Sequence, residues 1–151
     1  MTAHDLSAVA PVSHAIFRVA RAHKALAGRL LREAGLHPGQ ELVLTTLWTH
    51  GPQRLVDLVA AIESDAPTMT RSVARLERAG LVSRSPSPTD GRVTIVEATE
   101  ASLVLRAKVE HAWRELERIT TASLTSDEQA RTVGALATLE RALEAAERTE
   151  F

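Results

Sequence analysis

The chain has 151 residues, a formal net charge of −1, 44% hydrophobic residues and 25% charged residues, the composition of one globular domain rather than of a disordered chain. It contains no cysteine, which excludes disulfides, thiolate metal sites, cysteine nucleophiles and thiol-based oxidant sensing. Aromatic residues make up only 3%, with no tyrosine, and this counts against recognition of single-stranded nucleic acid by base stacking.

The sequence has no feature of a membrane or secreted protein. No segment approaches the ~18 consecutive apolar residues of a membrane span. The N-terminal stretch lacks a basic segment ahead of an apolar one, so we expect no secretion signal and a cytoplasmic location.

Three elements are expected in the first part of the chain, all helical. Between residues 12 and 30, apolar residues recur at steps of four and three, which predicts a long helix that ends near Gly35. A second helix is expected to open at Pro38 and to close at Gly51. A short third helix follows over residues 55–62.

The middle of the chain predicts a helix followed by a hairpin. The helix spans residues 66–79, with Asp65 as its N-cap, Pro67 in its first turn and Gly80 at its end. Residues 81–84 and 93–96 are rich in β-branched residues and predict two short strands joined by a long hairpin tip.

Helix is expected again from about Thr99 to residue 119, and the last helix begins at a capping box, residues 125–128. The order of elements is that of a mainly α protein with a small β-hairpin wing, a winged helix-turn-helix between long outer helices. The outer helices carry an apolar seam that such a small domain cannot cover. A second copy of the chain is therefore expected to bury it.

Charge is unevenly distributed along the chain. Residues 66–92 carry a net charge of +3, residues 1–65 are neutral and residues 93–151 carry −4. A local basic block can bind a polyanion, although the charge alone is better explained by a solvated charged face.

The helix over residues 66–79 and the hairpin together suggest binding to double-stranded DNA. Arginine reads guanine, threonine reads several base edges, and an arginine at a narrow hairpin tip suits the minor groove. Asp90, an anion, is expected to orient Arg92 rather than to touch DNA. The residues expected at the DNA are Pro67, Thr68, Thr70, Arg71, Arg75, Arg84, Asp90 and Arg92.

These residues resemble the MarR family of bacterial transcriptional regulators. The family pattern of threonine-arginine, leucine, glycine-leucine-valine and acidic-x-arginine is matched by Thr70-Arg71, Leu76, residues 80–82 and the pair Asp90 and Arg92. The chain departs from the family where Glu63-Ser64 replaces the common glycine and aliphatic residue in the turn before the recognition helix. It departs again after the wing, where Ala98 replaces a leucine and Ser102 a glycine.

The resemblance covers the whole chain and implies a single domain over residues 1–151. Its winged-helix part is expected at about residues 36–99, and its dimerisation helices at about 8–34 and 100–148. The family implies a homodimer on a palindromic operator, usually a repressor, usually released by a small ligand or an oxidant. By resemblance, a ligand pocket between the two parts is lined by Phe17, Arg21, Trp48 and Trp113, although the three aromatic residues also fit a plain hydrophobic core.

Other functions are weaker on this sequence. The six histidines show no metal-ligand spacing, so neither a metal nor another cofactor is expected. No nucleophile elbow, phosphate loop or paired-carboxylate motif predicts an enzyme. The alternative is a winged helix that binds protein, which does not need the combination of Thr68, Arg71 and Arg92.

Overall fold

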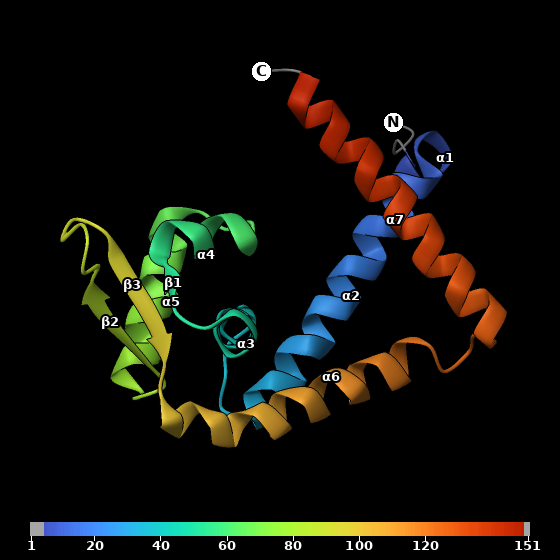
Figure 1. Ribbon diagram of the computed structural model, residues 1–151. Helices are drawn as coiled ribbons and strands as arrows, with labels where there is room; N and C mark the ends of the chain where they lie inside the picture. Colours follow the sequence, from blue (N-terminus) through green and yellow to red (C-terminus); the bar gives the residue numbers. More distant parts are fainter. Residues whose placement is uncertain (1–4, 150–151) are drawn as a thin grey trace. The chain divides into compact units, whose positions relative to one another are not determined.

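The computed structural model describes residues 5–149, so both ends of the expected 1–151 domain lie outside the described residues. The chain forms two compact units, which divide between Leu116 and Glu117. The first holds the winged helix and the helices before and after it, and the second holds the C-terminal helix (Figure 1). The helical elements are α1 (Leu6–Val9), α2 (Pro11–Glu33), α3 (Gln40–His50), α4 (Leu55–Ala61), α5 (Ala66–Arg78), the 3-10 helix η1 (Glu100–Leu105), α6 (Arg106–Thr120) and α7 (Ser126–Thr149).

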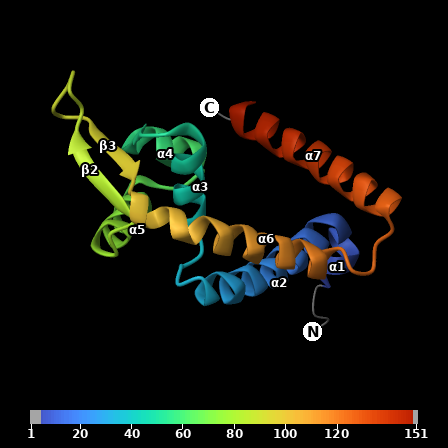
Figure 2. The ribbon, with the colours of Figure 1, turned by 60° about the horizontal axis from the view of Figure 1, so that its bottom comes forward.

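A small antiparallel sheet completes the first unit. Its strands are β1 (Gln53–Arg54), β2 (Val82–Pro86) and β3 (Thr94–Ala98), in the order β1-β3-β2. Val82 pairs with Ala98 and Pro86 with Thr94, so β2 and β3 form the predicted hairpin. Figure 2 shows this hairpin extending past α4 and α5 to a free tip.

The hydrophobic core of the first unit joins its helices to the base of the hairpin. Leu44, Leu58, Val73 and Val96 are 0% exposed and come from α3, α4, α5 and β3. Val109 and Ala112 extend this cluster onto α6. Close packing against this core fixes one face of α5 in place. The opposite face of the helix is left exposed to solvent.

Most predicted boundaries agree with the structure to within a few residues. Asp65 caps α5 and its carboxylate accepts the Thr68 N–H, as the sequence predicts. The capping box at α7 is also confirmed, since the Thr125 N–H donates to the Glu128 carboxylate and the Glu128 N–H donates to the Thr125 hydroxyl.

Three elements differ from the prediction. The one-turn helix α1 and the two-residue strand β1 are too short to leave a periodic signal. The helix expected from Thr99 begins as η1, where the Ser102 hydroxyl donates to the Thr99 carbonyl at 2.6 Å and accepts the indole N–H of Trp48 at 2.9 Å. Ser102 is 0% exposed, so the family departure at this position supplies a buried hydrogen-bond bridge between α3 and η1.

Large apolar side chains remain exposed on the outer helices, as the uncovered seam predicts for a single chain. None of the described helices is both long and apolar enough to cross a membrane. The exposed apolar residues of these helices include Leu6 and Val9 on α1, Val12, Ile16, Phe17 and Val19 on α2, Trp113 and Ile119 on α6, and Val133, Leu136 and Leu143 on α7.

Candidate nucleic-acid interface

Helix α5 presents a polar face to solvent. Met69, Val73 and Leu76 are at most 2% exposed and fix the opposite face of the helix in the core. The outward side chains are short near the N-terminus and cationic further along, an arrangement that lets a helix approach base edges closely. The exposed residues of this face are Pro67, Thr68, Thr70, Arg71 and Arg75, all of which the sequence predicts.

The N-terminus of α5 is organised by Asp65, whose role extends beyond that of a helix cap. Its carboxylate accepts both the Thr68 N–H and the Thr68 hydroxyl, each at 2.8 Å. These bonds, with a smaller contribution from the charge of Arg71, hold the pKa of Asp65 below its usual value. The guanidinium of Arg71 donates to the Thr68 hydroxyl at 3.4 Å. The Thr68 N–H is therefore not free for phosphate.

The hairpin tip places Asp90 beside Arg92, as predicted. The Arg92 N–H donates to the Asp90 carboxylate at 3.1 Å, and the Arg92 Nε lies 3.8 Å from the same oxygen. The Arg92 side chain is 95% exposed. The carboxylate thus holds the turn and leaves the guanidinium in solvent, at the end of the hairpin.

Arg84, also predicted as a DNA contact, is hydrogen-bonded to a carboxylate in the single chain. Its Nε and Nη2 donate to the Glu77 carboxylate at 3.2 and 2.8 Å. The side-chain hydrogen bonds from Arg84, and then its charge, lower the pKa of Glu77. Arg84 is therefore committed to the end of α5. Three other arginines are predicted DNA contacts: Arg71, Arg75 and Arg92. Among residues 5–149, none of their guanidinium groups is hydrogen-bonded to a carboxylate in this way.

The turn between α4 and α5 contains a residue in an unusual backbone conformation. Glu63 has a φ of 51°, the left-handed region that glycine occupies at no steric cost. The glycine that the resemblance implies at this turn would occupy this conformation freely, and Glu63 adopts it at some cost.

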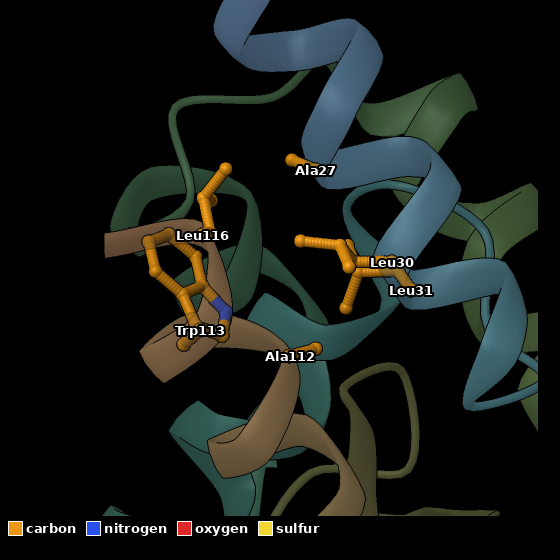
Figure 3. A pocket seen from close by; sticks show the side chains of 6 residues that line it. All are labelled: Ala27, Leu30, Leu31, Ala112, Trp113 and Leu116. Carbon is orange, nitrogen blue, oxygen red and sulfur yellow. The ribbon is translucent and has the colours of Figure 1, made fainter. Parts of the chain in front are cut away.

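The four residues expected to line a ligand pocket have different surroundings in the single chain. Trp48 is half-buried against the core and bonded to Ser102, whereas Phe17 is 66% exposed. Trp113 lines a narrow apolar cleft of about 10 Å³ between α2 and α6, opposite Leu30 (Figure 3). Arg21 is exposed on α2 and does not line this cleft.

A wider open groove lies nearby, at the end of α2 and the start of α6. It encloses about 610 Å³ and is lined in part by Leu30, Lys108 and His111. This volume falls in the range of small-molecule sites, which the cleft beside Trp113 does not reach. Among residues 5–149, no group of three histidine or carboxylate side chains is arranged to hold a metal ion.

Comparison with known proteins agrees with this geometry. The model of the MarR family matches residues 36–94. The transcriptional repressor NicR of Pseudomonas putida is 30% identical over 118 residues, which cover 78% of this chain and 75% of NicR.

Two solved structures share the fold over nearly their whole length. The regulator PcaV of Streptomyces coelicolor, solved with its natural ligand, has a TM-score of 0.80 at 26% identity, and the match covers 95% of this chain and 99% of PcaV. BpsR of Bordetella bronchiseptica, whose DNA binding is regulated by 6-hydroxynicotinic acid, has a TM-score of 0.78 at 25% identity, and the match covers 86% of this chain and 98% of BpsR. With the helix-turn-helix, the wing and these relatives in agreement, the chain belongs to the MarR family of transcriptional regulators.

Proposed function

We propose that the protein is a transcriptional repressor that binds a pseudo-palindromic operator in double-stranded DNA as a homodimer and is released by a small ligand. The repressor role is supported by the similarity to NicR, which is itself a repressor. Release by a ligand is supported by the similarity to BpsR and PcaV, both described with small molecules.

The observation that carries the proposal is the shared exposure of the α5 face and the wing arginine. Helix α5 has 13 residues, about 20 Å of helix, and such a helix fits the major groove. Arg71 and Arg75 would then meet base edges or phosphates, with Thr68 and Thr70 beside them and Pro67 at the point of entry. Arg92 would reach the flanking minor groove while Asp90 holds the tip.

The homodimer explains the exposed apolar residues of the outer helices. Helices α1 and α2 in the first unit and α7 in the second carry large apolar side chains that water meets in the single chain. Two-fold symmetry would place two recognition helices about 34 Å apart, one turn of DNA, and so requires a pseudo-palindromic operator. The dimerisation helices are thus residues of about 8–34 and 100–148, around a winged helix of about 36–99.

The effector site is best supported at the groove between the end of α2 and the start of α6. Its volume suits a small molecule, and its lining combines the cation of Lys108 with the carboxylates of Glu33 and Glu115, so it offers polar groups of both charges to a ligand. Of the residues predicted to line the pocket, Trp113 lines the neighbouring cleft between the same two helices. The proposed role is binding, without a catalytic step. Because an operator-binding protein acts on the chromosome, its proposed location is the cytoplasm.

Binding of the purified protein to a labelled random-sequence duplex tests the first step of this function. We expect two chains per bound duplex and an affinity that falls steeply between 50 and 200 mM salt, because displaced counterions dominate phosphate binding. A protein that ignores duplex DNA at 50 mM salt, or binds it with no salt dependence, would instead be a protein-interaction module.

A further inference from the structure

We infer that Glu77 and Arg84 form a clamp that sets the position of the β2–β3 hairpin relative to α5, and that both are positioning residues for operator binding. The inference rests on the proposed DNA-binding function. It assigns a role in that function to two residues whose side chains are joined to each other.

The clamp joins the last turn of α5 to the base of the hairpin. One oxygen of the Glu77 carboxylate accepts the Arg84 backbone N–H at 3.1 Å, and the other accepts the guanidinium Nη2 at 2.8 Å and Nε at 3.2 Å. Three donors of one residue are therefore held by one carboxylate. Because one of them is the backbone of β2, the carboxylate orients the strand as well as a side chain.

The place of Glu77 in α5 points to a specific role for its charge. A carboxylate near the C-terminus of a helix faces the negative end of the helix dipole, where it is disfavoured. The other ionisable residues of the last turn are Arg75 and Arg78, which the dipole favours. The two side chains of the ion pair are 34% and 37% exposed, and a surface pair of this kind contributes little to overall stability. Its main physical consequence is therefore orientation.

A small change at the base of the hairpin grows toward its tip. Asp90 lies six positions beyond Arg84, and an extended strand rises about 3.3 Å per residue, so the lever is up to about 20 Å long. A tilt of about 5° at the base would move the tip by nearly 2 Å, and a hydrogen bond does not survive a displacement of that size. The clamp thus determines whether α5 and Arg92 reach their grooves at the same time.

A double-mutant cycle with Arg92 tests this inference. Glu77→Gln, Arg92→Ala and the double variant are titrated with an operator duplex selected from random DNA, and with a random duplex as the non-specific probe. Glu97→Gln is the matched control, because it removes the same charge from an exposed position of the neighbouring strand β3.

We expect Glu77→Gln to weaken operator binding 3- to 10-fold although it removes a negative charge near DNA, and to leave binding to the random duplex unchanged or tighter. In the Arg92→Ala background the same substitution should change operator affinity less than 2-fold, because the misplaced residue is already absent. Arg84→Gln breaks the clamp from the other side and should show the same decrease and the same dependence on Arg92. Glu97→Gln should show no decrease in operator affinity.

Two results would overturn the inference. One is a Glu77→Gln variant that tightens operator binding as Glu97→Gln does, which would reduce Glu77 to a repelling charge. The other is an equal decrease with and without Arg92, which would mean that the ion pair only stabilises the fold. Both results require a wild-type protein that binds the operator selectively. A wild-type protein without that selectivity would refute the proposed function itself.

Discussion

Arg71→Ala is the substitution that probes base recognition most directly. Arg71 is exposed on α5, and its guanidinium donates to the Thr68 hydroxyl at 3.4 Å, at the long end of hydrogen-bond distances. Asp65 keeps both of its bonds to Thr68 without Arg71, so the helix cap survives the substitution. The variant should therefore bind DNA less tightly with little change in the free energy of unfolding.

The expected decrease in affinity follows from the interaction that an arginine makes with a guanine. A bidentate pair is worth about 1–3 kcal/mol, and the weak bond to Thr68 subtracts little from it when it breaks. A homodimer carries the substitution in both half-sites, so the cost on the full operator is about 2–6 kcal/mol if the sites are independent. This corresponds to a decrease in affinity of between about 30-fold and about 20,000-fold.

The assay is a titration of the operator duplex at fixed salt, by fluorescence anisotropy, with operators carrying each base in turn at one position per half-site. At the base pair that Arg71 reads, Arg71→Ala should bind the four operator variants with nearly equal affinity. At the other positions of the half-site, it should discriminate between bases as the wild-type protein does. Arg71→Lys keeps the charge but cannot form the bidentate pair, so it should recover non-specific binding without the selectivity. Unchanged operator affinity for Arg71→Ala would refute the assignment of α5 as the reading helix.

Further substitutions test the wing, the dimer interface and the turn before α5. Arg92→Ala should weaken binding to specific and random duplexes together, and it should lower the slope of log affinity against log salt by about 1 for each phosphate that is no longer neutralised. Asp90→Ala should also weaken binding, although it removes a negative charge. Tighter binding of Asp90→Ala would show that Asp90 only repels DNA. Leu136→Asp changes an exposed apolar position of α7. It should lower the dimer fraction measured by light scattering at about 1 µM, and with it the affinity for the operator. A variant that remains a dimer and binds the operator with wild-type affinity would exclude this face from the interface. Glu63→Gly removes the steric strain of a positive φ at residue 63. If it raises the free energy of unfolding by about 1 kcal/mol, the melting temperature should rise by about 2–4 °C. A lower melting temperature would show that the added backbone entropy of the unfolded chain outweighs the strain.

The main elements could be predicted from the sequence because their signals are local. The cap Asp65 with Pro67 defines the start of α5, and the apolar spacing of Met69, Val73 and Leu76 defines its buried face. Asp90 and Arg92 lie two residues apart, so their contact at the tip also follows from the sequence.

The rest depends on distances that the sequence does not contain. Arg84 looks like a free cation in the basic block, and only the return of β2 against α5 brings it to Glu77. The bridge between Trp48 and Ser102 joins residues 54 positions apart, so the sequence shows an aromatic residue without its partner. Only the family resemblance places Phe17 in a pocket, and in the single chain this residue is largely exposed on α2.

Selection of bound sequences from a random duplex library, with the wild-type protein at near-physiological salt, is the most direct test of operator recognition by a homodimer. We predict enrichment of one pseudo-palindromic sequence whose half-sites are centred about 10 base pairs apart, one turn of DNA. A single asymmetric half-site, or no enrichment above the starting library, would contradict operator recognition by a homodimer.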